Sequence, residues 1–150
     1  MHMYRRFTAM IATSTVVMLP LMYLNTYAAD HVFFSETRSY MALVMGAAMA
    51  LIMLAFMHGM LANPRFNAVV VVAAIAVFAA ALWLVRSQAS VDQVSYMKAM
   101  IPHHSIAILT SERAHISDPR VRRLADGIIE TQRREIAEMK ALISELEAAQ

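Results

Sequence analysis

The sequence predicts an all-α protein, in which three transmembrane helices are followed by an antiparallel helical hairpin. Hydrophobic residues make up 59% of the 150 residues, and the mean hydropathy is +0.51. This composition is too apolar for an ordinary soluble domain. Residues 1–86 contain three long segments without a charged side chain, and apolar residues in 87–150 recur with the 3.6-residue period of a helix.

The charged residues divide the chain into two predicted domains. Residues 1–86 contain five Arg and two acidic residues, whereas residues 87–150 contain eight Lys or Arg and nine acidic residues. We therefore expect a membrane domain over 1–86 and a polar domain over 87–150 that is too nearly neutral to bind nucleic acid. The chain has no Cys. This excludes disulfides and thiolate sites, so any soft metal ligand must be one of the 14 Met.

The predicted membrane spans cover about residues 7–29, 39–63 and 66–85. Each is long enough for a ~30 Å hydrocarbon layer, which takes about 20 helical residues. The first could instead be a cleaved signal peptide, because residues 26–29 loosely resemble a cleavage site. Its long apolar run favours a retained anchor.

Short loops with Lys or Arg tend to stay cytoplasmic. Arg5, Arg6 and Arg65 lie before the first span and between the second and third, whereas the loop over 30–38 carries two acids and one Arg. We therefore expect a protein of the cytoplasmic (inner) membrane, surrounded by lipid, with a cytoplasmic N-terminus. The domain over 87–150 is then periplasmic or extracellular.

The second predicted span carries a methionine stripe, because a Met recurs at every fourth residue. A small-residue seam of Ala42, Gly46 and Ala50 runs beside it and would let helices approach closely. The stripe is either adaptable packing or a thioether track for metal. The methionines of the stripe are Met41, Met45, Met49, Met53 and Met57. His58 continues the row of small residues and would stand at the end of the track.

Capping residues set the predicted ends of two helices in the polar domain. Ser90 with Gln93 resembles a capping box, and the first helix should run to about His115. Asp118 as N-cap and Pro119 at the first position should start a second helix that runs almost to the C-terminus.

One hairpin has too little core to stand alone. We expect a homodimer that completes a four-helix bundle, or packing on the chain's own spans.

Polar and sulfur side chains interrupt the apolar faces of both predicted helices. A turn near Ser117 sets His103 and His104 opposite Gln132, and Met100 opposite Glu135. Together they form a candidate metal site, in which Gln132 and Met97 are ligands or supporting residues. The predicted metal ligands are His103, His104, Met100, Met139 and Glu135.

Each residue of this site also has a reading without metal. His104 could bond Gln132, which would satisfy two buried polar groups. The methionines could be core filler, and Glu135 could pair with Arg134 or Lys140.

The joint pattern resembles the ferritin-like domain-of-unknown-function family three-hundred-and-five over residues 91–146. The residues that carry it are Met100-Ile101-Pro102-His103-His104-Ser105-Ile106-Ala107-Ile108, Pro119-Arg120-Val121-Arg122-Arg123-Leu124-Ala125, Ile128-Ile129, Gln132, Glu135-Ile136 and Met139. The resemblance implies a helical, exported domain associated with copper, and it maps the family's histidine pair to His103 and His104. The chain departs from the family at Thr110, where a Met is common, and it carries the motif once.

Imidazole and thioether ligands suit Cu(I), and imidazole with carboxylate also admits Cu(II). We therefore expect a membrane-anchored protein that sequesters copper or passes it to a donor or acceptor protein, and not an enzyme. The alternative is a metal-free membrane scaffold or helical partner-binding module. A di-iron oxidase built on Glu112 and His115 is disfavoured, because Arg122 and Arg123 lie opposite in the predicted pairing.

Overall fold

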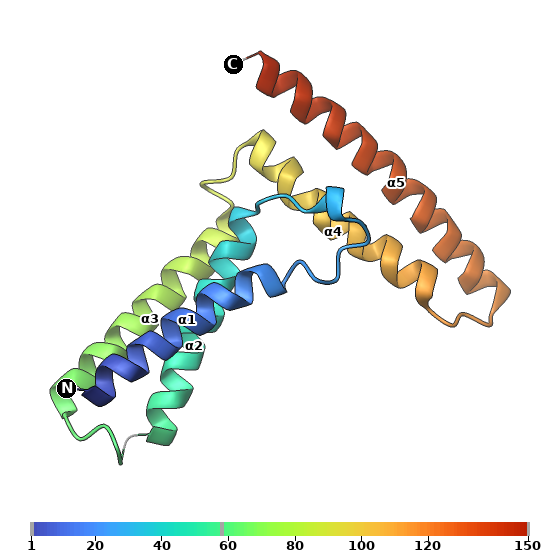
Figure 1. The fold of residues 1–150 in the computed structure, drawn as a ribbon. Coiled ribbons are helices and arrows are strands. Elements are labelled where there is room, and N and C mark those ends of the chain that lie inside the picture. The colour runs from blue at the N-terminus through green and yellow to red at the C-terminus, as the bar shows by residue number, and fades with distance from the viewer. Residues whose placement is uncertain (1, 58, 150) are drawn as a thin grey trace. The chain divides into compact units, whose positions relative to one another are not determined.

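The computed structural model describes residues 2–57 and 59–149. These residues form α-helices and one short 3-10 helix without any β-strand, which confirms the prediction of an all-α protein (Figure 1). In chain order the elements are α1 (His2–Leu21), η1 (Ala29–His31), α2 (Glu36–Met57), α3 (Pro64–Ser87), α4 (Gln93–Arg113) and α5 (Pro119–Ala148).

The helices belong to two compact units. The apolar unit comprises Met1–Met22 and Thr37–Ser90, and therefore α1, α3 and all but the first residue of α2. The polar unit comprises Tyr23–Glu36 and Val91–Gln150, and therefore η1, α4 and α5. Residues 23–36, which the sequence analysis placed within the first 86 residues, thus pack with two helices that follow much later in the chain.

Two helices, α2 and α3, are long and apolar enough to cross a membrane. Their 22 and 24 residues correspond to about 33 and 36 Å at 1.5 Å per residue, which exceeds a ~30 Å hydrocarbon core. This length and composition are compatible with a membrane protein.

The prediction of a third span over residues 7–29 is wrong. The helix α1 ends at Leu21, so its uncharged part from Phe7 onwards is only about 22 Å long. Pro20 lies in the last turn and lacks the N–H that an interior helical position needs. After Leu21 the backbone turns, and the Thr26 hydroxyl donates to the carbonyl oxygen of Tyr23.

Small residues on α2 let α1 approach it closely. Ala42, Gly46 and Ala50 of the predicted seam are buried, and a Cβ added at Gly46 would lie 2.2 Å from Oγ1 of Thr15. The methionines of the α2 stripe are half-buried. Two of them, Met53 and Met57, pack against the core of the apolar unit. His58, at the end of the predicted track, lies outside the described residues.

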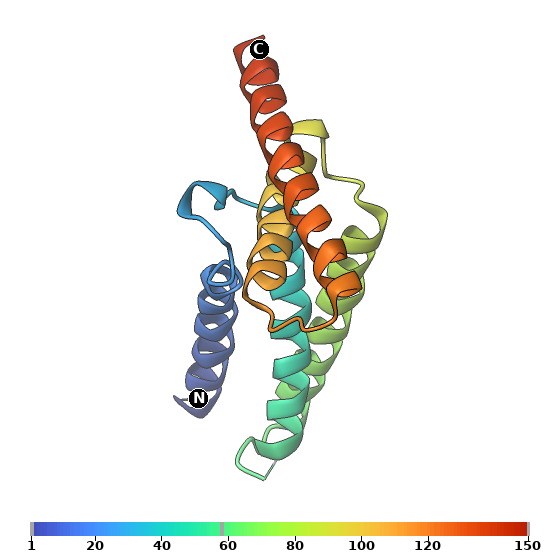
Figure 2. The same cartoon turned by 90° about the vertical axis from the view of Figure 1, so that its right-hand side faces the viewer.

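In the polar unit, α4 and α5 lie side by side and antiparallel (Figures 1 and 2). Lys98 near the start of α4 pairs with Glu147 near the end of α5, whereas Glu112 near the end of α4 pairs with Arg133. Phe33 from the segment before α2 packs against their shared core. The buried members of that core are Met97, Ile101, Ile108, Ile136 and Ile143.

The start of α5 confirms the predicted cap, because the Asp118 side chain accepts hydrogen bonds from the backbone of Arg120 and Val121. The capping box predicted at Ser90 is wrong. The N-cap of α4 is Asp92, whose carboxylate accepts from the Ser95 N–H at 2.7 Å. Asp92 lies three residues before Ser95, which is the spacing that lets a side chain reach the N3 amide. The same helix ends at Arg113 and not at His115.

Candidate metal centre

A groove of about 540 Å³ runs along one side of α4 and α5. It brings together side chains that the sequence analysis selected as metal ligands or supporting residues. Tyr96, Leu142 and Leu146 add apolar walls to the same groove, and Gln93 and Glu138 add polar ones. The predicted site residues in it are Met97, Met100, His104, Glu135 and Met139.

The imidazole of His104 faces the carboxylate of Glu135. Nδ1 of His104 lies 3.1 Å from Oε2 of Glu135, and the two side chains are 15% and 39% exposed. The oxygen nevertheless lies away from the direction in which a ring N–H would point, so Nδ1 is buried without an aligned hydrogen-bond partner. A buried polar atom in this condition costs free energy unless something satisfies it.

Burial lowers the pKa of His104 below the usual value for histidine. The carboxylate of Glu135 opposes this shift because it favours the imidazolium, while the neighbouring His103 adds to it. The net lowering keeps the imidazole neutral at neutral pH, and neutral imidazole is the form that binds metal.

The thioethers of Met97, Met100 and Met139 reach the groove from both helices. Met97 is buried in the core, while Met100 is half-buried. Met139 on α5 packs against the same core. Met97 and Met139 therefore serve as core filler, and all three methionines also line the groove.

Two predicted residues lie outside the groove lining. His103 is exposed, and its ring centre lies 6.1 Å from that of His104 in an edge-to-face arrangement. Gln132 is half-buried, and His104 faces Glu135 in place of the amide that the metal-free reading gave it.

The pairing of the two helices differs from the expected one, by about one turn at His104 and by about three turns at Glu112. The sequence analysis set Gln132 opposite His104 and Arg122 with Arg123 opposite Glu112, whereas Glu135 lies opposite His104 and Arg133 opposite Glu112. The connection between the two helices covers residues 114–118, because α4 ends two residues before its predicted end.

The groove contains side chains of the types that bind soft metal ions. One imidazole with a buried, unaligned nitrogen lies beside a carboxylate, and three thioethers line the same surface. Imidazole and thioether are the protein ligands that suit Cu(I) best when Cys is absent. Within residues 2–57 and 59–149, no group of three or more His, Asp or Glu side chains is arranged to hold a metal ion.

The sequence analysis missed the contribution of residues 23–36 to this unit. The hydroxyl of Ser105, which is 0% exposed, accepts the Tyr27 N–H at 2.8 Å and lies 2.9 Å from Nδ1 of His31. At the surface, Lys140 of α5 pairs with Asp30. One signal was available, since Ser105 lies between Ile101 and Ile108 on the buried face of α4 and so needed a polar partner.

Comparison with known proteins finds similarity for part of the chain. Residues 87–150 match the family described as Domain of unknown function (DUF305). Uncharacterized protein L153 of Acanthamoeba polyphaga mimivirus is similar to the chain, with 41% identity over 66 residues that cover 43% of each protein. The chain thus spans less than half the length of this curated relative, and no solved structure matches it significantly. Residues 87–150 therefore carry a domain of unknown function.

Proposed function

We propose that this chain is a membrane-anchored, extracytoplasmic copper-binding protein. In this proposal α2 and α3 anchor it in the cytoplasmic membrane, and the groove between α4 and α5 holds copper for storage or transfer to another protein. The observation that carries the proposal is the buried, unaligned Nδ1 of His104 in a groove lined by three thioethers.

Within the groove, His104 is the principal ligand, and Met100 and Met139 are the soft ligands. Glu135 either binds the ion or holds the imidazole in position, as carboxylates near metal-binding histidines commonly do. When bound, copper supplies a soft Lewis acid that these neutral and polarisable donors stabilise. The neutral state of His104 removes the need to expel a proton from that side chain before binding.

Several predicted residues remain outside this minimal set. His103, on the exposed side of α4, is available as a ligand to copper that arrives from solvent or from a second copy of the chain. Gln132 lies one turn away from Glu135 on α5 and is proposed as a supporting residue.

A homodimer that pairs two grooves into a four-helix bundle would add donors from its second chain. Measuring the mass of the detergent-solubilised protein, corrected for bound detergent, tests this arrangement.

Anaerobic titration with Cu(I) against a chromophoric chelator tests the site. The full chain in detergent is required, because residues 23–36 are part of the unit that carries the groove. The double variant His103→Ala with His104→Ala should lose copper retention. Met100→Leu should weaken it by at least about tenfold, since loss of even a supporting residue costs that much in metal sites.

Met10→Leu, in the exposed surface of α1, is the matched control for a thioether lost outside the groove. It should retain copper like the natural chain. Equal retention in all variants would remove the copper assignment and leave the alternative, a metal-free membrane scaffold or helical partner-binding module.

A further inference from the structure

A second hollow lies in the apolar unit, where α1 and α3 both begin. It has a volume of about 1100 Å³. Its walls combine apolar, aromatic and cationic side chains, and no residue of the proposed copper groove contributes to it. The lining includes Met3, Tyr4, Arg5, Met60, Asn63 and Phe66.

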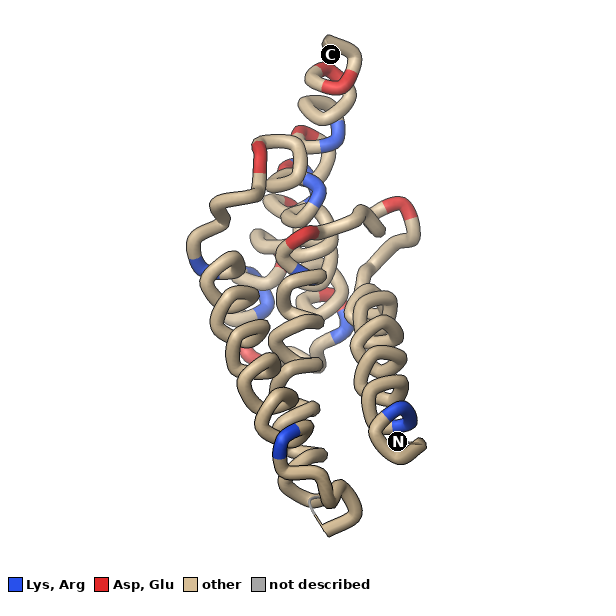
Figure 3. Tube along the Cα trace, turned by 90° about the vertical axis from the view of Figure 1, so that its left-hand side faces the viewer, with Lys and Arg blue, Asp and Glu red and all other residues tan. Residues whose placement is uncertain are grey.

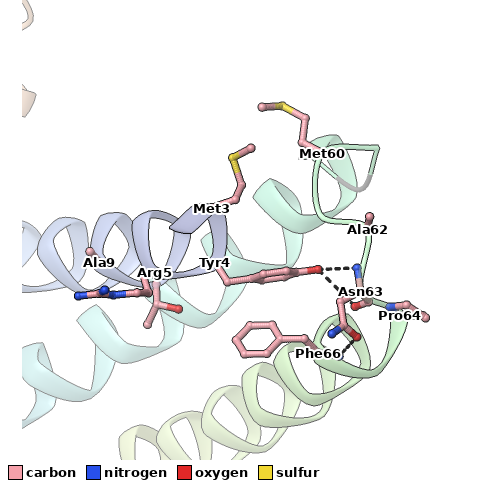
Figure 4. Close-up of a pocket in the computed structure, with 10 residues that line it drawn as sticks. Met3, Tyr4, Arg5, Ala9, Met60, Ala62, Asn63, Pro64 and Phe66 are labelled. Carbon is pink, nitrogen blue, oxygen red and sulfur yellow. Dashed lines mark hydrogen bonds between the residues drawn. The ribbon is translucent and has the colours of Figure 1, made fainter. Parts of the chain in front are cut away.

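Hydrogen bonds hold one wall of this pocket in place. The Tyr4 hydroxyl accepts the Asn63 N–H at 2.8 Å and donates to Oδ1 of Asn67 at 3.1 Å. The ring of Tyr4 lies 4.3 Å from that of Phe66. Figure 4 shows Tyr4 reaching towards Asn63, with the thioether ends of Met3 and Met60 on one side of it. These contacts fix the Tyr4 wall of the pocket relative to the start of α3.

The charge of the apolar unit is entirely positive. Residues 1–22 and 37–90 contain five Arg and no Asp or Glu. Arg5 lines the pocket, and Arg65 lies between two lining residues, Pro64 and Phe66. These two arginines and Arg6 are exposed and have no ion-pair partner among the described residues. In Figure 3, the charged positions at the end of the helices near the N-terminus are all basic. An exposed cationic rim above an apolar wall matches an anionic headgroup attached to acyl chains.

We propose that this pocket binds an anionic phospholipid. The phosphate lies at the rim with Arg5 and Arg65, and the acyl chains lie against Met3, Met60 and Phe66. This inference rests on α2 and α3 crossing a membrane, as proposed above, because their ends then lie at the depth of the lipid headgroups. It does not depend on copper.

Native mass spectrometry of the full chain in neutral detergent tests the proposal. Dioleoyl phosphatidylglycerol and dioleoyl phosphatidylcholine, which share acyl chains, are added in equal amounts. The natural chain should retain the anionic lipid preferentially. Arg5→Gln should weaken that retention by about fivefold, and adding Arg65→Gln should weaken it by about fivefold again.

Arg86→Gln is the matched control, because Arg86 lies in the last turn of α3 at its other end. It should behave like the natural chain, and Arg5→Lys should restore most of the retention. Equal binding of both lipids, or equal losses in Arg86→Gln and Arg5→Gln, would overturn the proposal. Displacement of the lipid by millimolar inorganic phosphate would also overturn it, since the pocket would then be a small-anion site. Copper titration of the same samples measures binding at the groove between α4 and α5 separately, so failure of one proposal can be told from failure of the other.

Discussion

Oγ of Ser105 lies 2.9 Å from Nδ1 of His31, although 74 residues separate them in the sequence. The same oxygen accepts the N–H of Tyr27. One fully buried hydroxyl thus connects the middle of α4 to the segment that precedes α2, and residues 23–36 belong to the polar unit.

Replacing Ser105 should destabilise the polar unit. Ser105→Ala leaves the Tyr27 N–H and the His31 nitrogen without their partner, so we expect a loss of about 1–3 kcal/mol in the free energy of unfolding. Chemical denaturation of the full chain in detergent, followed by helical circular dichroism, measures it. Thr110→Ala is the control, because the Thr110 hydroxyl bonds to two carbonyls of its own helix, those of Ile106 and Ala107. Equal effects of the two substitutions would contradict a special role for Ser105.

Glu135→Gln should lower the pKa of His104 still further. The carboxylate favours the imidazolium, so its removal leaves burial and His103 unopposed. Titration of the imidazole followed by NMR measures the shift. Glu138→Gln removes another carboxylate that lines the same groove and should move the pKa of His104 less. An upward shift in Glu135→Gln would show that the carboxylate does not act on the ring as proposed.

Acid should destabilise the polar unit. Burial lowers the pKa of both His31 and His104 below 6.5, the ordinary value. Unfolding restores the ordinary value, so the unfolded chain binds more protons as the pH falls through it. The stability that these neutral rings provide is therefore complete above about pH 6.5 and is lost as the pH falls below it. Unfolding free energies measured from pH 7.5 to 5 should fall, and the fall should be smaller in His31→Gln with His104→Gln.

Two glycines should respond oppositely to alanine. Gly46→Ala places a methyl group 2.2 Å from Oγ1 of Thr15 and should destabilise the apolar unit by about 1–3 kcal/mol, as overpacking does. Gly127→Ala meets nothing within 4 Å and lies inside α5, where Ala favours the helix by about 0.5–1 kcal/mol. Thermal unfolding compares them, and Thr15→Ala should rescue Gly46→Ala. A neutral Gly46→Ala would mean that the helices separate readily there.

Local signals in the sequence predicted the helices well where one side chain decides the outcome. Asp118 and Pro119 start α5 because a carboxylate can cap free N–H groups and proline needs none. The seam at Gly46 was predictable because only small side chains permit such an approach.

Features that depend on contacts distant in sequence were harder to predict. The apolar run over 7–29 has the composition of a span, but Pro20 and the turn at Tyr23 end its helix early. Residue periodicity identifies the apolar face of each helix but not the register between two helices, so it did not predict the pairing of His104 with Glu135. The contact between His31 and Ser105 was hard to predict, because the sequence indicated only that the Ser105 hydroxyl would be buried and would need a polar partner.

The polar unit is assembled from two stretches of chain, and the apolar helices α2 and α3 lie between them in the sequence. If both helices traverse a bilayer, the even number of crossings returns the chain to the compartment it left, as the bond between His31 and Ser105 requires. During synthesis, Tyr27 and His31 are made first. The polar unit can fold only after α2 and α3 have inserted into the bilayer and α4 has been made. An insertion error in either helix would therefore strand the two halves on opposite faces of the bilayer.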